Sequence, residues 1–183
     1  MTKRALLVID YTNDFVASDG ALTCGKPGQD IQAAILKRME EFNQAGDYVI
    51  FPTDTHFLND KFHPETKLFP AHNIAGTPGH DLYDQVGVWF KNHQSQENIW
   101  QYDKNRYSAF VNTNLDNFLR ERGVTEVWLT GVCTDICVLH TAVDAYNHNY
   151  QITVPSDCVA TFTEYGQAWG LQHFENSLGA TIL

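Results

Sequence analysis

Short apolar runs alternate along this chain with longer segments whose apolar residues follow a helical spacing. The run from Ala5 to Ile9 is apolar at every position and stops abruptly at Asp10. Such a run is typical of a strand that is buried on both faces between two layers of helices. Comparable runs lie at 48–51, 88–90, 127–129 and 152–154, and we expect a strand at each of them.

Helices are expected in the segments between these runs. The apolar residues Ile31, Ile35, Met39 and Phe42 recur at every third or fourth position, and Gly46 after them is a helix-ending signal. The same spacing predicts further helices at 115–119, 136–146 and 165–178. Strands that alternate with helices form βαβ units, and hence a mostly parallel sheet with helices on both faces. We therefore predict an α/β fold, a single three-layer αβα domain that spans residues 1–183.

The composition excludes several classes of partner. The chain carries 12 Lys and Arg against 22 Asp and Glu, a formal net charge of −10, which repels nucleic acid backbones and anionic lipid surfaces. No apolar run approaches the roughly 18 residues that cross a bilayer. The cysteines, with no apolar signal segment after the first residues, favour reduced thiols over a disulfide framework. We expect a cytoplasmic protein that acts on a small molecule and binds neither nucleic acid nor membrane.

Reactive side chains follow the ends of several predicted strands. In parallel sheets, ligands bind beyond the carboxyl ends of the strands, so residues at these positions meet at one rim. The candidates are Asp10 after the first strand, Asp54 and His56 after the second, Cys133 and Cys137 after the strand at 127–129, and Lys104 between Trp100 and Tyr107. Each has a plain structural alternative, because an Asp after a strand is often a helix cap, a Lys is usually solvated and a Cys is often core.

A metal site is one interpretation of the residues after the second strand. Asp54 and His56 are two residues apart, so on an extended segment both side chains project from the same face. His72 lies in a loop rich in Gly and Pro that can fold back toward them. One carboxylate and two imidazoles suit Zn²⁺, Mn²⁺ or Fe²⁺ and leave coordination positions open for water or substrate. His63 and Glu65 are further candidate ligands, although a place in a surface loop explains them more simply.

Cys137 fits the role of a nucleophile better than Cys133 does. A thiol in the first turn of a helix sits at the positive end of the helix dipole, which lowers its pKa and favours the thiolate. Cys133 lies in the turn itself, where its backbone amide can bind an oxyanion while its thiol takes no part. A zinc or disulfide motif of Cys133, Cys137 and His140 is a weaker interpretation, because neighbours in one helix make a poor structural clamp. Cys24 and Cys158 have no such setting, and we expect structural roles for both.

Several of these residues belong to motifs that follow one another in a characteristic order. The motifs are Leu6-Leu-Val-Ile-Asp10-x-x-x-Asp14-Phe15, Thr53-Asp54-x-His56, Pro70-x-His72-x-x-x-Gly76-Thr-Pro-Gly79, Lys104, and Gly131-Val-Cys-Thr-Asp-Ile-Cys137-Val. In this order they resemble the isochorismatase-like cysteine hydrolases and, within them, the nicotinamidases. The resemblance extends from the first strand to the helix after Cys137.

The resemblance implies a role for each matching residue. Asp10, Lys104 and Cys137 match the catalytic triad of this family, and the backbone amides of Cys133 and Cys137 match its oxyanion hole, with a cis peptide bond before Cys133. Asp54, His56 and His72 match the metal ligands, and Glu65 lies near a fourth ligand that some members have. Phe15, Phe69 and Tyr107 match aromatic residues around a pyridine ring, where relatives often have Trp in place of Phe69 and an aromatic residue in place of Thr55. One divalent metal ion is implied, zinc in the first place with iron or manganese as alternatives, and so is a homo-oligomer.

The chemistry of these residues agrees with amide hydrolysis. Because an unactivated amide is a poor electrophile, its hydrolysis gains from a thioester formed by a strong nucleophile. Asp10 can take the thiol proton, pass it to departing ammonia and then activate water, while Lys104 keeps Asp10 ionised. We therefore expect hydrolysis of nicotinamide to nicotinate and ammonia through a Cys137 thioester, in NAD salvage, with pyrazinamide as a second substrate.

Two alternatives stay open at this stage. The first keeps the fold but changes the substrate to isochorismate, a carbamoyl amine or another small amide. The set of Asp54, His56 and His72 speaks against isochorismatases proper, which lack these ligands. The second alternative is a non-enzymatic redox or metal-binding module built on Cys133 and Cys137.

Overall fold

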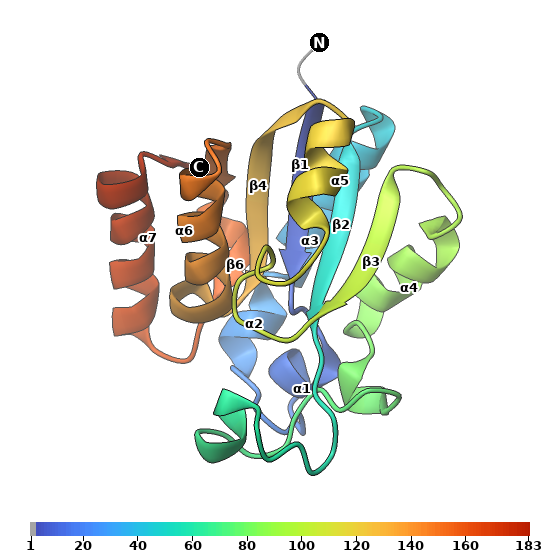
Figure 1. Ribbon diagram of the computed structural model, residues 1–183, viewed down its shortest axis with the longest axis vertical. Coiled ribbons are helices and arrows are strands. Elements are labelled where there is room, and N and C mark those ends of the chain that lie inside the picture. The colour runs from blue at the N-terminus through green and yellow to red at the C-terminus, as the bar shows by residue number, and fades with distance from the viewer. Residues whose placement is uncertain (1–2) are drawn as a thin grey trace.

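A seven-stranded sheet forms the centre of the structure, a computed structural model that describes residues 3–183. Its strands are β1 (Lys3–Ile9), β2 (Tyr48–Asp54), β3 (Ile99–Lys104), β4 (Val124–Val132), β5 (Gln151–Val154), β6 (Val159–Ala160) and β7 (Thr181–Ile182). They are arranged in the order β3-β2-β1-β4-β5-β7, and β6 also pairs with β4. All the paired strands are parallel, so their carboxyl ends meet at one edge of the sheet, at the lower end in Figure 1.

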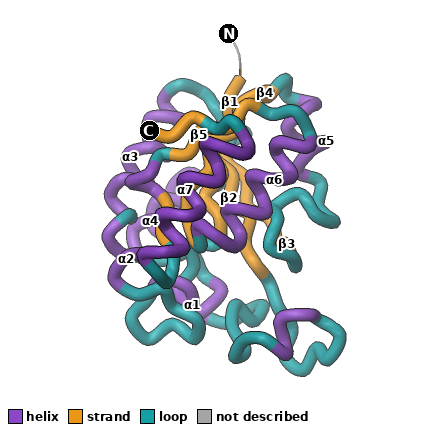
Figure 2. The backbone as a smooth tube through the Cα atoms, turned by 90° about the vertical axis from the view of Figure 1, so that its left-hand side faces the viewer, coloured by secondary structure: helices purple, strands orange, loops and turns teal. Residues whose placement is uncertain are grey.

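Helices cover both faces of this sheet. One face carries α1 (Asn13–Val16), α2 (Lys26–Asp30), α3 (Gln32–Gln44) and α4 (Asp84–His93), and the other carries α5 (Leu115–Glu121), α6 (Leu139–Asn147) and α7 (Glu164–Leu178). Short helical turns complete the fold at η1 (Pro64–Lys67), η2 (Pro78–His80), η3 (Thr134–Val138) and η4 (Ser156–Cys158). Figure 2 shows α3 and α4 on one side of the strands and α5 and α6 on the other. The predicted single-domain, three-layer α/β fold is confirmed.

The strand β1 shows why its sequence is apolar throughout. Ala5, Leu7 and Ile9 pack into the core under α5, α6 and α7, whereas Leu6 and Val8 pack into the core under α3 and α4. Successive side chains of a strand point to opposite faces, so a strand covered by helices on both sides needs an apolar residue at every position. The other predicted strands at 48–51, 127–129 and 152–154 lie within β2, β4 and β5.

One predicted strand is wrong. The residues 88–90 lie in the middle of α4, which buries Val86 and packs Phe90 against Phe51 on the sheet with 5.1 Å between the ring centroids. A run of three apolar residues cannot distinguish a strand from part of a helix. The third strand is instead β3, whose residues are mixed in polarity because β3 lies at the edge of the sheet and pairs only with β2. Lys104 is consequently the last residue of a strand.

Among residues 3–183, none of the helices combines the length and the apolar character that a membrane span needs. The described part of the chain includes all four cysteines, and each is a buried, free thiol.

Candidate active site

Because of the strand order, the predicted site residues lie together at one edge of the sheet. Lys104 ends β3 directly across from Asp54, which ends β2. Asp10 follows β1, the next strand in the order, and Cys133 and Cys137 follow β4 on its other side. Parallel pairing of four consecutive strands therefore places a carboxylate, an ammonium group and thiols next to one another.

Gly131 allows β4 to approach β1 closely at this edge. It pairs with Ile9, has a φ of +104°, and leaves no room for a Cβ atom, which would collide with the carbonyl oxygen of Ile9. Only glycine combines this backbone conformation with so close a contact. A side chain here would separate the strand that leads to Asp10 from the strand that leads to Cys137.

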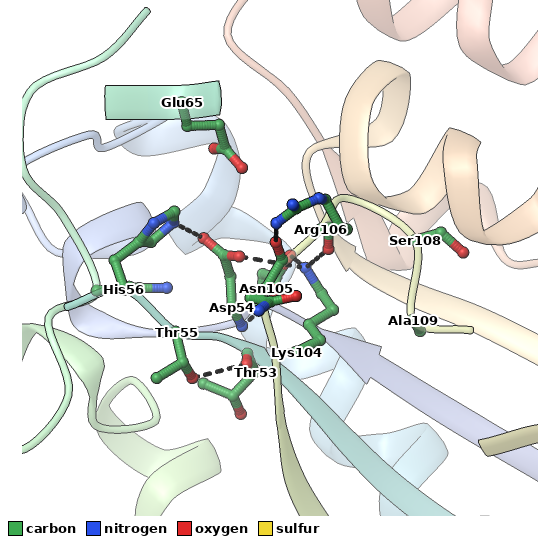
Figure 3. Close-up of polar contacts among 12 residues, drawn as sticks. Thr53, Asp54, Thr55, His56, Glu65, Lys104, Asn105, Arg106, Ser108 and Ala109 are labelled. Atoms are coloured by element: carbon green, nitrogen blue, oxygen red, sulfur yellow. Dashed lines mark hydrogen bonds and ion pairs between the residues drawn. The ribbon is translucent and has the colours of Figure 1, made fainter. Parts of the chain in front are cut away.

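Asp10 and Lys104 form a buried ion pair. The Nζ atom of Lys104 lies 2.8 Å from Oδ2 of Asp10. It also lies 3.7 Å from Oδ1 of Asp54 and donates a hydrogen bond to the carbonyl of Arg106 at 3.0 Å (Figure 3). Oδ1 of Asp10 accepts a hydrogen bond of 2.7 Å from the backbone N–H of Asp54. Burial raises the pKa of Asp10 to about 6, although Lys104 acts in the opposite direction. The pair thus joins a fixed cation to a carboxyl group that can gain and lose a proton near neutral pH.

The thiol of Cys137 is buried beside this ion pair. Burial raises the pKa of Cys137 well above its usual range and outweighs the opposing effect of Lys104, while Asp10 raises it further. The expectation that the helix dipole lowers the pKa of Cys137 and favours its thiolate is therefore wrong, because removal of the charged sulfur from water raises the pKa more than Lys104 lowers it. The chain also enters this helix irregularly, through the π-helical turn η3. A base has to remove the proton, and Asp10 is the carboxylate whose charge acts most strongly on the pKa of this thiol.

Cys133 lies in the turn that precedes Cys137. The peptide bond before Cys133 is cis. The carbonyl of Cys133 accepts hydrogen bonds of 3.1 Å from the backbone N–H groups of Ile136 and Val138, which close the turn around Cys137. The thiol of Cys133 is buried next to that of Cys24. Of the two thiols in this turn, the one of Cys137 is thus the one beside Asp10.

The second predicted group, the candidate metal ligands, forms one compact cluster. Ligand atoms of Asp54, His56, Glu65 and His72 all lie within 4.8 Å of one another, and all four residues are buried. Oδ2 of Asp54 is 2.6 Å from Nε2 of His56 and 3.6 Å from Nε2 of His72, which is 3.7 Å from Oε2 of Glu65. Figure 3 shows the Glu65 carboxylate directed from its own segment toward Asp54 and His56. The turn η1 thereby brings Glu65 from a predicted surface loop into the cluster.

The orientation of His72 fits a metal ion. Its Nδ1 lies 2.8 Å from the carbonyl of Pro70, to which it donates a hydrogen bond, so Nε2 is the nitrogen left to bind a cation. Nε2 of His72 is buried and has no hydrogen-bond partner, and the same holds for Oδ1 of Asp54. Buried polar atoms without partners are rare, and these two are acceptors, which a cation can satisfy. Two imidazoles with carboxylate oxygens are a donor set that zinc and similar divalent metals accept.

The electrostatics of the cluster also favour a cation. Burial opposes a positive charge on His72, yet the carboxylates of Asp54 and Glu65 raise the pKa of His72 to about 10. Burial likewise opposes ionisation of Asp54, but Lys104 and then His56 and His72 hold the pKa of Asp54 well below its usual range. The site therefore attracts positive charge, whether as protons or as a metal ion.

His63, the other candidate ligand, lies outside this cluster. Its Nε2 is 2.8 Å from the carbonyl of Asn105, and its Nδ1 accepts a hydrogen bond of 3.3 Å from the backbone N–H of Glu65. Both ring nitrogens are therefore occupied. The residue is buried rather than exposed on a loop, and it holds the segment of Glu65 against the segment that follows Lys104.

An apolar pocket opens beside Cys137. Its walls contain the three aromatic residues expected there together with several others, namely Phe15, Leu22, Glu65, Phe69, Tyr107, Cys133, Ile136, Cys137 and Phe162. Glu65 belongs both to this wall and to the ligand cluster, so the cluster borders the pocket. A larger cavity lies between α4 and β3, but none of the predicted catalytic residues and metal ligands lines it. The pocket beside the thiol is the one lined by Cys137, and a further cavity that shares Glu65 and Phe69 with it is lined by His56 and His72.

Sequence analysis missed three residues of this pocket wall. Phe162 lies two residues after the end of β6 and could have been found by the rule for strand ends, but β6 is only two residues long and leaves no periodic signal. Ile136 was assigned to the core of a helix, and it lies in the turn η3 instead. Nothing in the sequence distinguishes Leu22, which belongs to the irregular segment between α1 and α2.

Comparisons with known proteins agree with this architecture. The sequence profile of the isochorismatase domain matches residues 4–183. Over 180 residues the chain is 54% identical to the uncharacterized isochorismatase family protein PncA of Bacillus subtilis (strain 168), which covers 98% of this chain and 98% of the relative.

Two solved structures extend the comparison to three dimensions. The crystal structure of the nicotinamidase/pyrazinamidase PncA from Bacillus subtilis has a TM-score of 0.97 at 50% identity and covers 99% of each chain. The pyrazinamidase of Pyrococcus horikoshii, solved in complex with zinc, has a TM-score of 0.86 at 26% identity and covers 99% of this chain and 98% of that chain.

Proposed function

This chain belongs to the isochorismatase family, and on that premise we propose that it is a nicotinamidase, an amide hydrolase that converts nicotinamide to nicotinate and ammonia in NAD salvage. One observation carries the proposal. The thiol of Cys137 and Glu65, a member of the cluster of metal-ligating side chains, line the same small apolar pocket, and the buried Asp10–Lys104 ion pair acts on that thiol. The pocket suits a flat ring, and the thiol and ion pair suit hydrolysis of an amide attached to it.

The reaction begins with proton transfer from the Cys137 thiol to Asp10. The sulfur then attacks the amide carbonyl carbon, and the negative charge that develops on the carbonyl oxygen is received by the backbone N–H groups of Cys133 and Cys137. Asp10 returns the proton to the amide nitrogen as the carbon–nitrogen bond breaks, so that ammonia leaves and a thioester to Cys137 remains. Lys104 stabilises the ionised form of Asp10 throughout and fixes its orientation through the 2.8 Å contact.

The second half of the reaction releases the acid. Asp10 removes a proton from a water molecule, which attacks the thioester carbonyl, and the carbon–sulfur bond breaks. The proton held by Asp10 returns to the sulfur, so that the thiol of Cys137 is regenerated, and the acid leaves and releases the second proton of the water as it ionises to nicotinate. No further reactant is required, because one water is consumed for each amide hydrolysed.

Asp54, His56, Glu65 and His72 would hold one divalent metal ion, which we propose to be zinc, with iron or manganese as alternatives. The solved pyrazinamidase–zinc complex supports this choice. When bound, the ion supplies a Lewis acid that can accept a ring nitrogen of the substrate. Phe15, Phe69 and Tyr107 would hold the ring by apolar contact.

The wider setting follows from the same family membership. We propose that the protein acts in the cytoplasm, where its free thiols stay reduced, and that it forms a homo-oligomer. Its partner is a small-molecule substrate, and the net charge of −10 speaks against nucleic acid and anionic membranes. Pyrazinamide, which keeps the ring nitrogen at the same distance from the amide, is a second expected substrate.

Ammonia release from nicotinamide, measured with and without a metal chelator, tests the proposed function. The expected result is hydrolysis that the chelator reduces and added zinc, iron or manganese restores. Isochorismate and an N-carbamoyl amine are assayed in parallel. Turnover of one of these compounds without turnover of nicotinamide would contradict the proposal, and so would the absence of any hydrolysis.

A further inference from the structure

Asn73, the residue after His72, attaches the loop that carries His72 to two other segments of the site. The side chain of Asn73 is completely buried, and its neighbour Thr12 is as well. Asn73 makes three polar contacts with two other segments: its backbone N–H donates to Oδ2 of Asp14 at 2.7 Å, its side-chain Oδ1 accepts from the hydroxyl of Thr12 at 2.9 Å, and its carbonyl accepts from the backbone N–H of His56 at 3.0 Å. One residue thus links the ends of β1 and β2 with the loop.

The backbone of Asn73 is shaped for this position. Its φ is +43°, in the left-handed region that Asn tolerates better than most other residues with a side chain. Directly after it, Ile74 forms a bridge with His56, and the backbone N–H of Ala75 donates to the carbonyl of His56 at 2.9 Å. The loop therefore runs beside His56 for several residues, and the turn at Asn73 sets where His72 lies relative to it.

Asp14 provides the second anchor. Asp14 belongs to the first sequence motif, Leu6-Leu-Val-Ile-Asp10-x-x-x-Asp14-Phe15. Its Oδ2 accepts from Asn73, and its Oδ1 accepts from the backbone N–H of Ala21 at 3.2 Å. Gly79 packs directly against this carboxylate, since a Cβ atom at that position would collide with it. Such a close approach of loop backbone to Asp14 shows that the loop is fitted to this side chain.

These contacts connect the two halves of the site. Thr12 and Asp14 lie on the short segment that begins with Asp10, and the backbone N–H of Thr12 donates to the carbonyl of Asp10 at 2.9 Å. The ring of Phe15, at the end of the same segment, packs edge-on against the ring of His72 with 5.3 Å between centroids. A shift of Asn73 would therefore move His72 relative to both His56 and Asp10.

We propose that Asn73, held by Thr12 and Asp14, is a positioning residue that sets the place of the metal ligand His72 relative to His56 and to the catalytic Asp10. The inference rests on the proposed function, in which the cluster binds a divalent metal. Asn73 touches neither substrate nor metal and acts through His72 and His56. Partners of this kind, which orient metal ligands without binding the metal, typically affect metal affinity 10- to 100-fold.

Removal of the Thr12 hydroxyl provides the test. Thr12→Val keeps the shape of the side chain and deletes the bond to Asn73, whereas Thr12→Ser keeps the hydroxyl. Thr130→Val is the matched control, because Thr130 is equally buried and its hydroxyl donates to the carbonyl of Leu7 over the same 2.9 Å, away from the ligand loop. The Kd for Zn²⁺ is measured without substrate, by competition with a chromophoric chelator, and the thermal unfolding of each metal-free variant is recorded beside it.

The expected result is a Kd for Zn²⁺ at least about 10-fold higher in Thr12→Val, near the wild-type value in Thr12→Ser, and unchanged in Thr130→Val. Both Val variants should unfold at a lower temperature than the wild type when metal-free, since each loses one buried hydrogen bond. A merely structural Thr12 would lower the unfolding temperature without changing the Kd for zinc, and this outcome would overturn the inference.

A second variant removes the acceptor of the hydrogen bond between Thr12 and Asn73. Asn73→Gly retains the left-handed backbone and both backbone contacts but deletes the side-chain acceptor. It should also weaken zinc binding, and it replaces Thr12→Val as the test if that variant does not fold. Wild-type affinity in a folded Asn73→Gly protein would overturn the inference while leaving the proposed function intact. If the wild-type protein bound no divalent metal, both the inference and the proposed metal site would be overturned. The ammonia assay with nicotinamide would then test the proposed hydrolysis separately.

Discussion

The ammonium group of Lys104 lies 2.8 Å from Oδ2 of Asp10, and neither side chain is accessible to solvent. The contact joins the ends of two strands that are not neighbours, since β2 lies between β1 and β3. A buried carboxylate of this kind depends on its counter-ion, because a lone charge away from water is strongly disfavoured. The ion pair therefore supports both the stability of the site and its capacity to move a proton.

Replacement of Lys104 by Met should destabilise the protein by about 3–5 kcal/mol near neutral pH, because Asp10 and Asp54 lose their buried cation. The destabilisation caused by this substitution should become smaller as the pH falls. The pKa of Asp10 is already raised by burial to about 6, above the unfolded value of 3.8, and without Lys104 it rises further. A group with a raised pKa in the folded state contributes stability at low pH that disappears as the pH rises through the folded pKa. Urea unfolding at pH 5 and pH 8 measures this difference, and an equal loss at both values would contradict the account.

Cys137→Ala should abolish nicotinamide turnover, by roughly a thousandfold or more, whereas Cys133→Ala should retain much of it. The reason is the setting of each thiol, since Asp10 and Lys104 act on the pKa of Cys137, whereas the strongest influence on the pKa of Cys133 is the neighbouring thiol of Cys24. Steady-state ammonia release measures both variants, with circular dichroism to verify folding. The reverse order of activity would show that the nucleophile has been assigned to the wrong residue.

Asp10 and Cys137 should behave as one catalytic unit. The double variant Asp10→Asn/Cys137→Ala is expected to be hardly slower than the slower of the two single variants, because each change alone already removes thioester formation. The measurement is a double-mutant cycle, with kcat/KM determined for the two single variants, the double variant and the wild type. Losses that multiply in the double variant would argue against a shared step.

Alanine in place of His56 or His72 should empty the metal site without unfolding the domain. Glu65→Ala should also weaken metal binding, although the sequence alone suggests that Glu65 has a minor role. Oε2 of Glu65 lies 3.7 Å from Nε2 of His72, inside the ligand cluster. Metal content after gel filtration, expected at about one ion per wild-type chain, measures the effect. His173→Ala, which removes a ring stacked on Trp169, is the control and should keep its metal. Full occupancy in both the His56 and the His72 variant would exclude these ligands.

Metal should contribute more to nicotinamide hydrolysis than to benzamide hydrolysis. Phe15, Phe69 and Tyr107 can hold either ring, but only the pyridine nitrogen can bind a metal. A site that requires a specific polar partner rejects an analogue without it by a factor of up to about 10⁴. Benzamide should therefore be a very poor substrate of the metal-loaded protein, and metal removal should reduce the difference in kcat/KM between nicotinamide and benzamide. The test is the ratio of kcat/KM for nicotinamide to that for benzamide, measured on the metal-loaded and on the metal-free protein. An unchanged ratio would show that the metal does not recognise the ring nitrogen.

The amino-acid sequence alone determined which segments are buried and hence the layers of the fold. The uninterrupted apolar run from Ala5 to Ile9 requires helices on both faces of its strand, and the structure has them. Burial leaves a periodic signal in the sequence, because side chains alternate along a strand and recur every three or four residues along a helix. The same logic placed Asp10, Asp54 and Cys137 after strand ends, where a parallel sheet gathers them.

Only the tertiary structure decided how these residues meet. The edge strand that ends in Lys104 has no strong periodicity, because only one of its sides pairs with the sheet, and a helix at 88–90 was mistaken for it. The approach of Glu65 to His72 depends on the path of an irregular loop, and the raised pKa of Cys137 depends on the removal of water from all sides. Distances between segments and the loss of hydration arise from the packing of the whole chain, so no local pattern of residues records them.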